Sequence, residues 1–367
     1  MRDLRLAVIG TGHLGKIHAR LAKNVPGIKL VAVVDPDTKA CAAVATENLV
    51  KACSSHTEIM HEIDAAIVAT PTRYHREVAA ELLTNDIHVL VEKPITLTAS
   101  DADHLNALAG RKSLVLQVGH VERFNPVFAH VAGTIESPRY IEATRASGYT
   151  FRSTDVGVVL DLMIHDIDLV LSLVQSSVAE VAATGFTAFG PHEDMVQARL
   201  TFENGCVANL TASRVSYAPR RDMQIFAANG HFNLDFTTRN LKSISPVPAV
   251  VSSSWDPHHI SDAQKESIKE HLFESYLPLQ EVELQQCNAI EEEIKDFAHC
   301  IRHGGTPRVT GQAGRDAVAV AQQVIQAVES HYWTDQDQVL RGPRMTPEPK
   351  VISISQPVAT TKHRKAG

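Results

Sequence analysis

The chain has 367 residues, of which 44% are hydrophobic and 21% charged, and its formal net charge is −7. This length allows two domains with separate cores, and the negative charge argues against non-specific binding of nucleic acid. No apolar run approaches the length of a membrane span, and the first apolar run is too short for a signal peptide. The five cysteines lack CxxC spacing, which predicts reduced thiols in a cytoplasmic protein and no zinc site.

A glycine-rich turn follows the first apolar run of the chain. Residues 6–15 read LAVIGTGHLG, so Gly10, Gly12 and Gly15 have GxGxxG spacing before a helical pattern at His13–Lys23. In a dinucleotide-binding turn the first glycine permits the tight turn, the second admits the pyrophosphate, and the third lets the helix pack on the strand. Free N–H groups at the helix N-terminus then bind phosphate. We expect the cofactor to contact Gly10, Thr11, Gly12, His13, Leu14 and Gly15.

The second apolar strand, Ile28–Val34, ends in Asp35, twenty residues after Gly15. A carboxylate at this spacing accepts hydrogen bonds from the adenosine ribose of NAD and repels the 2′-phosphate of NADP. The sequence therefore predicts NAD in preference to NADP, with Lys39 close enough to weaken that preference.

Strands and helices alternate through the rest of residues 1–122. Further apolar strands are predicted at Ala65–Ala69, Val89–Val91 and Leu114–Val118, with helices at 38–47, 74–83 and 100–109 between the strands. This pattern is typical of an α/β fold with a doubly wound parallel sheet, in which ligands bind beyond the carboxyl ends of the strands. The residues expected at that edge, beside the glycine turn and Asp35, are Thr70, Pro71, His75, Glu92, Lys93, Pro94 and His120.

A second domain is predicted over residues 123–340, with a disordered tail over 341–367. A short helix (125–131), a strand (140–146) and an apolar helix, Val156–Leu173, precede alternating strands and the hairpin signal Asn204-Gly205. We expect a mostly antiparallel, open-faced sheet with a helix on one face, and a homodimer or homotetramer formed through the other. The strands are expected at 178–188, 196–202, 206–212, 223–228 and 232–236, a loop at 245–259, and helices at 284–301 and 313–328.

The apolar helix carries several ionisable residues, and their presence among apolar neighbours requires an explanation. Asp161 and His165 are four residues apart, and Asp168 follows three later, so all three share one face of an α-helix. A carboxylate beside an imidazole orients it as a general base. Two alternatives stay open from the residues alone: a structural ion pair, and a divalent metal held by all three side chains. The dinucleotide turn favours His165 as base, and Lys93 at the ligand edge can stabilise a substrate alkoxide.

These motifs together resemble the Gfo/Idh/MocA family of oxidoreductases. The resemblance rests on the glycine turn, on Ala69-Thr70-Pro71 with His75, on Glu92-Lys93-Pro94, and on Asp161 with His165. It implies a Rossmann domain, an open-faced α/β domain, and NAD(P)-dependent oxidation of a sugar-like alcohol. It also implies that Lys93, Asp161 and His165 are catalytic, and that Glu92 lies beside the cofactor.

A narrower resemblance concerns residues 119–126 (GHVERFNP) and 153–158 (STDVGV), which are similar to UDP-N-acetylglucosamine 3-dehydrogenases within that family. It suggests oxidation at C3 of the linked sugar. Arginines bind a diphosphate in bidentate fashion, so Arg123, Arg152 and Arg214 are candidate substrate ligands, as is Asn125 for a hydroxyl or amide; surface salt bridges are the alternative for each arginine. Two other functions stay open: oxidation of a free polyol or inositol, and a non-catalytic NAD-binding sensor or scaffold.

Overall fold

The N-terminal half of the molecule is built on one parallel sheet. The structure is a computed structural model that describes residues 2–151, 156–251, 258–335 and 338–347. Its first sheet has the order β3-β2-β1-β4-β5-β6 with every pairing parallel. The strands are β1 (Leu4–Ile9), β2 (Ile28–Val34), β3 (Lys51–Cys53), β4 (Ala65–Val68), β5 (His88–Glu92) and β6 (Leu116–Gly119). This order reverses direction between β1 and β4, so a ligand crevice is expected beyond their carboxyl ends.

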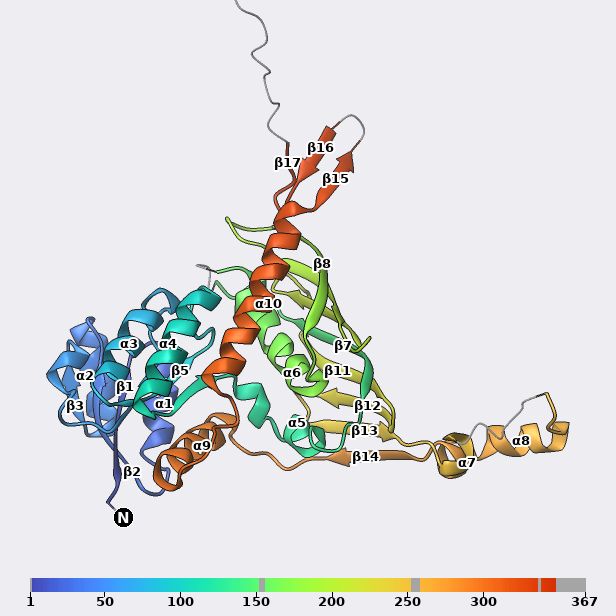
Figure 1. Cartoon of the computed structure of the whole chain (residues 1–367), viewed down its shortest axis with the longest axis horizontal. Helices are drawn as coiled ribbons and strands as arrows, with labels where there is room; N and C mark the ends of the chain where they lie inside the picture. Colours follow the sequence, from blue (N-terminus) through green and yellow to red (C-terminus); the bar gives the residue numbers. More distant parts are fainter. Residues whose placement is uncertain (1, 152–155, 252–257, 336–337, 348–367) are drawn as a thin grey trace, which may run out of the picture.

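Helices lie over this sheet (Figure 1), and its central strands are buried. All four residues of β4 are inaccessible to solvent, which is why the strands read as continuous apolar runs rather than as alternating patterns. The covering helices are α1 (His13–Ala22), α2 (Thr38–Asn48), α3 (His75–Thr84) and α4 (Ala99–Lys112), with α9 (Ala289–His303) returning from the far end of the chain to pack against α1.

The second sheet has eight strands in the order β14-β13-β12-β11-β7-β10-β9-β8. The central pair β7–β10 is parallel and the other pairs are antiparallel. The strands are β7 (Pro138–Ala146), β8 (Val178–Phe186), β9 (Met195–Phe202), β10 (Val207–Ser213), β11 (Arg220–Ala227), β12 (Gly230–Asp235), β13 (Asn240–Ile244) and β14 (Leu279–Glu283). The predicted α/β fold class, with its parallel and mainly antiparallel sheets, is confirmed.

One face of the second sheet carries helices, and no helix of the described residues lies over the other (Figure 1). Helix α6 (Ile164–Val174), preceded by a π-helical turn at Val159–Met163, and the long α10 (Gly311–Ser330) pack on the covered face. Alternate residues of β9, such as Val196 and Ala198, are buried beneath them. The short α5 (Pro126–Val131) packs against the 3-10 turn Val121–Phe124 and against β12 of the second sheet.

The region after β13 differs from the sequence-based expectation. The predicted loop at 245–259 contains the short helix α7 (Pro248–Val251), followed by α8 (Asp262–Glu270) and a π-helical turn, Leu272–Tyr276. These elements project away from the body (Figure 1). The chain then returns as β14, so α9 begins at Ala289 and not at 284 as predicted.

The C-terminal segment forms a small three-stranded sheet. Its strands are β15 (Tyr332–Asp335), β16 (Gln338–Arg341) and β17 (Thr346–Pro347). The first residues of the predicted tail are therefore ordered, while residues 348–367 lie outside the described part of the chain. No helix within the described ranges is both long and apolar enough to cross a membrane.

Candidate active site

The glycine turn has three glycines with three different surroundings. Gly10 has φ +96°, and a side chain on it would lie 2.5 Å from the carbonyl oxygen of Ala69. A Cβ on Gly15 would lie 1.8 Å from the carbonyl oxygen of Gly10, so the helix can approach the strand only without one. A Cβ on Gly12 would meet no atom within 4 Å, and no side chain caps the start of α1 there. The turn therefore offers open space and free N–H groups at the position where a pyrophosphate binds.

Asp35 lies at the end of β2, beside this turn. Its carboxylate accepts hydrogen bonds from the backbone N–H of Thr11 at 2.7 Å and from the Thr11 hydroxyl at 3.0 Å. The backbone N–H of Asp37 donates to the other carboxylate oxygen at 2.9 Å. These bonds fix the side chain at the cavity wall, where it can accept further hydrogen bonds from ribose hydroxyls. A carboxylate acceptor at this position fits the adenosine ribose of NAD.

Glu92 and His75 lie at the carboxyl ends of the central strands. Glu92 is buried and lies 2.6 Å from Nε2 of His18. Burial alone would raise the pKa of Glu92, but the hydrogen bond to His18, the charges of His18 and Lys93 and the backbone N–H of Lys93 together outweigh burial, so the net shift is downward. Nδ1 and Nε2 of His75 lie 2.8 Å from the carbonyl oxygens of Pro94 and Thr70, respectively, joining the loops after β5 and β4. Burial lowers the pKa of His75, and its contacts with the carbonyl oxygens of Pro94 and Thr70 oppose that shift.

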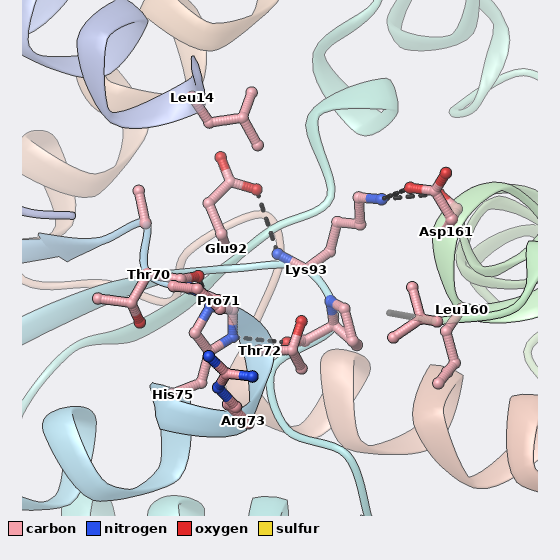
Figure 2. A pocket seen from close by; sticks show the side chains of 13 residues that line it. Leu14, Thr70, Pro71, Thr72, Arg73, His75, Glu92, Lys93, Leu160 and Asp161 are labelled. Atoms are coloured by element: carbon pink, nitrogen blue, oxygen red, sulfur yellow. Dashed lines mark hydrogen bonds and ion pairs between the residues drawn. The ribbon is translucent and has the colours of Figure 1, made fainter. Parts of the chain in front are cut away.

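Lys93 reaches across from the first domain to the second (Figure 2). Its Nζ donates to the backbone oxygen of Asp161 at 2.7 Å and to a carboxylate oxygen of the same residue at 3.3 Å. Both side chains are mostly shielded, with 15% and 23% of their surfaces exposed. The ammonium group is therefore held at a defined place between the domains.

The structure pairs Asp161 with Lys93 rather than with His165, and this corrects the expected orienting pair. The expectation assumed an α-helix, in which residues four apart stack. Asp161 instead lies in the π-helical turn Val159–Met163, whose wider turn changes that spacing. His165 is the second residue of the α-helix that follows, and its buried Nδ1 has no hydrogen-bond partner among the described residues.

His165 lies at the cavity wall in a positive environment. Burial lowers its pKa well below the ordinary value of 6.5, and the charges of Lys93, Arg145, His120 and Arg221 lower it further. The ring of His120 lies edge-on to it, with centroids 6.2 Å apart. The imidazole of His165 is therefore neutral at pH 7 and has a lone pair available to accept a proton.

One cavity joins these residues. It has a volume of about 1250 Å³, and its wall includes the glycine turn and Asp35 at one end and Lys93, Asp161 and His165 at the other. A smaller adjoining cavity of about 480 Å³ shares Leu14, Thr70, Pro71, Glu92 and Lys93 with it (Figure 2). The larger volume exceeds the roughly 300–1,000 Å³ typical of a site for one small molecule. It can accommodate a cofactor together with a substrate.

The predicted substrate arginines are engaged elsewhere. Arg123 donates to the carboxylate of Asp168 at 2.6 and 2.8 Å, and Arg214 donates to Asp194 at 2.6 Å. Asn125 accepts from the N–H of Val127 at the start of α5 and donates to Glu122 and Phe236. These three side chains do not line the large cavity, and Arg152 lies outside the described residues.

Sequence reasoning missed two charged groups, one on the wall of the cavity and one buried on α9. Arg221 lines the wall there. Arg221 alternates with Met223 and Ile225 along the sequence, which indicates that all three lie on the same face of one strand. The sequence does not reveal, however, which end of that strand meets the first domain. Glu293 on α9 is buried, and neither carboxylate oxygen has a hydrogen-bond partner among the described residues; burial and the charge of Glu92 raise its pKa well above 4.5. The described residues contain no cluster of three or more side chains suited to a metal ion.

The fold and the cavity together define an oxidoreductase that uses a dinucleotide. Residues 4–120 match the family model described as "Oxidoreductase family, NAD-binding Rossmann fold", and residues 127–233 match the "GFO/IDH/MocA C-terminal domain". The chain therefore belongs to the Gfo/Idh/MocA family, and its cofactor is NAD. The two matches lie on either side of the predicted domain boundary at residue 122, which itself stays a prediction.

Relatives in this family include dehydrogenases of a nucleotide sugar and of inositols. The UDP-N-acetylglucosamine 3-dehydrogenase of Acidithiobacillus ferrooxidans is 35% identical over 336 residues, covering 90% of this chain and 99% of that protein. Its solved structure has a TM-score of 0.78 at 34% identity, with the same coverage. The scyllo-inositol 2-dehydrogenase (NAD⁺) of Bacillus subtilis is 30% identical, covering 84% of this chain and 89% of the relative. These similarities identify an enzyme that acts on CH–OH groups.

Proposed function

We propose that this protein oxidises a hydroxyl group of a nucleotide-linked sugar, and that the C3 hydroxyl of UDP-N-acetylglucosamine is the best candidate. The observation that carries the proposal is the meeting of Lys93, Asp161 and His165 at one end of a cavity whose other end is the glycine turn. The 35% identical relative supports the choice of substrate, because it acts on this nucleotide sugar by name and matches along 90% of the chain.

Each polar group at the reacting end has a separate task. The neutral imidazole of His165 accepts the hydroxyl proton. The ammonium group of Lys93 donates a hydrogen bond to the same oxygen and stabilises the negative charge that develops there. Asp161 holds that ammonium group in place through its carboxylate and its backbone oxygen. Bound NAD, held at the glycine turn and Asp35, supplies the nicotinamide ring that accepts hydride from the carbinol carbon.

NADH formation measured at the absorbance of the reduced ring tests this proposal. UDP-N-acetylglucosamine should be oxidised, and His165→Ala and Lys93→Ala should each lower kcat by about two to four orders of magnitude. Affinity for NAD should stay within about twofold in both variants, because neither change reaches the glycine turn or Asp35. Full turnover by His165→Ala would refute the assignment of the base.

Oxidation of a free polyol is the second candidate, and the 30% identical inositol dehydrogenase favours it. The two candidates differ in whether the site holds a nucleotide. A polyol dehydrogenase has no reason to bind free UDP, so titration of the NADH-loaded protein with UDP separates them. If no sugar, polyol or nucleotide sugar is oxidised, the protein acts as an NAD-binding sensor or scaffold.

We further propose that two copies meet through the uncovered face of the eight-stranded sheet. Phe226 is 43% exposed there. It lies 4.2 Å from His231 and 5.9 Å from Tyr140 between ring centroids, forming an aromatic group near the end of β11 and the starts of β7 and β12. Light scattering should give a dimer or tetramer, and Phe226→Glu should shift it towards the monomer.

A further inference from the structure

Arg221 lies on the inner face of the second sheet, at the end of its strand. Side chains alternate along β11, and Met223 and Ile225 point into the core beneath the helices, where both are fully buried. Arg221 is two residues before Met223, so its side chain points to the same face of the sheet. It is exposed, however, because at this end the helix layer gives way to the large cavity, whose wall it shares with His165.

The other arginines near this end of the sheet have carboxylate partners. Arg145, directly opposite Arg221 in the strand pairing, contacts Glu122 at 2.6 Å and Asp166 at 2.8 Å. Arg123 and Arg214 have the partners described above. The guanidinium of Arg221, in contrast, makes no ion pair and no side-chain hydrogen bond within the part of the chain that the structure describes. Its five N–H donors are therefore available to a ligand.

An unpaired cation beside the base has an electrostatic consequence. The positive charge of Arg221 disfavours protonation of His165. It therefore opposes the step of the proposed reaction in which His165 takes up the hydroxyl proton. A neutral polyol offers such a group no counter-charge. A nucleotide sugar carries a diphosphate next to the reacting sugar, and a planar guanidinium binds phosphate oxygens through two parallel hydrogen bonds.

We propose that Arg221 binds the diphosphate of the nucleotide-sugar substrate and thereby selects charged substrates over neutral polyols. This inference rests on the proposed function, because it assigns a recognition residue to that substrate class. The position fits the substrate and not the cofactor pyrophosphate, since Arg221 lines the end of the cavity that holds His165, whereas the pyrophosphate belongs at the glycine turn.

Binding of free UDP to the NADH-loaded enzyme tests the inference without requiring turnover. Arg221→Gln should weaken UDP binding and raise KM for UDP-N-acetylglucosamine by roughly 10- to 100-fold, as expected for loss of a charge-assisted, bidentate contact. Arg221→Lys should restore part of the affinity, because it keeps the charge without the planar fork. Affinity for NAD should not change in either variant.

Arg220→Gln is the matched control. It removes the same charge from the adjacent residue, whose side chain points to the opposite face of the sheet and forms an ion pair with Asp222. UDP affinity in this variant should equal that of the wild type. Thermal unfolding of all variants shows whether the fold is retained. If Arg221→Gln is unstable, the UDP affinity of Arg221→Lys provides the second test.

The outcomes separate this inference from the proposed function. If wild-type protein binds UDP and Arg221→Gln binds it equally well, the inference is wrong and the proposed function stands. If Arg221→Gln loses NAD and UDP affinity equally, Arg221 serves the cofactor. If wild-type protein ignores UDP and oxidises a neutral polyol, the nucleotide-sugar assignment fails, and the role of Arg221 fails with it.

Discussion

Replacing Gly12 with alanine should weaken cofactor binding while preserving the fold. Gly12 has φ −66° and ψ −163°, a conformation that alanine adopts without strain. A Cβ built there meets no protein atom within 4 Å. The added methyl group would therefore occupy only the space in front of the N-terminus of α1, which is where the pyrophosphate must approach the backbone.

The size of the effect follows from the contacts that the methyl group blocks. A hydrogen bond from a backbone N–H to a charged group contributes about 1.5–3 kcal/mol. At about 1.4 kcal/mol per tenfold change, loss of one such bond weakens NAD binding by roughly 10- to 150-fold. The stability cost is about 1 kcal/mol or less, the difference between glycine and alanine at the start of a helix.

Calorimetric titration with NAD and urea unfolding measure the two quantities on the same sample. Gly15→Ala is the contrasting variant, because its Cβ would lie 1.8 Å from a backbone oxygen that cannot move without separating helix from strand. That variant should unfold easily or fail to accumulate. Wild-type affinity for NAD in a stable Gly12→Ala protein would refute the placement of the pyrophosphate at this turn.

Buried ionisable groups lead to three further predictions. Asp161→Asn keeps an acceptor for Lys93 but removes its counter-charge, so kcat should fall by roughly 10- to 100-fold with NAD affinity unchanged; an unaltered kcat would contradict the role of Asp161. Glu293 has a raised pKa because of burial and of Glu92, so its stabilising contribution is present below pH 4.5 and lost as pH rises. Glu293→Gln should therefore match wild type at pH 4 and exceed its unfolding free energy above that, by up to about 1.4 kcal/mol per pH unit. Burial lowers the pKa of His120, so its contribution is present above pH 6.5 and lost on acidification, and His120→Phe should flatten the loss of stability between pH 6.5 and 5.

Motifs within one short segment were predictable because their geometry is local. The glycine turn, Asp35 and the residues that follow each apolar strand could be placed at one edge, since parallel strands in a doubly wound sheet share their carboxyl edge. The structure places Asp35, Thr70 and Lys93 around one cavity. Strands with few buried residues were missed: β3 has three residues, two of them exposed, and β14 has five, four of them exposed.

Pairings between distant segments were not predictable from the sequence. Whether Arg123 binds a substrate or Asp168 depends on how η3 (Val121–Phe124) packs on α6, and no spacing along the chain encodes that contact. The π-helical turn is a similar case. Residues 159–163 read VLDLM, which suits an α-helix equally well, so the sequence predicted an Asp161–His165 pair that the wider turn prevents.

The charges around His165 reconcile a weak base with effective proton transfer. Lys93 lowers the pKa of the imidazole, which by itself disfavours proton uptake. The same ammonium group, positioned by Asp161, also stabilises the alkoxide and so lowers the pKa of the substrate hydroxyl. Lys93 thus acts on both the base and the substrate: it keeps His165 unprotonated at neutral pH and makes the substrate hydroxyl a stronger acid. Loss of Lys93 should therefore shift the acid limb of the pH–rate profile upwards as well as reduce the rate, a combination that a purely structural lysine would not produce.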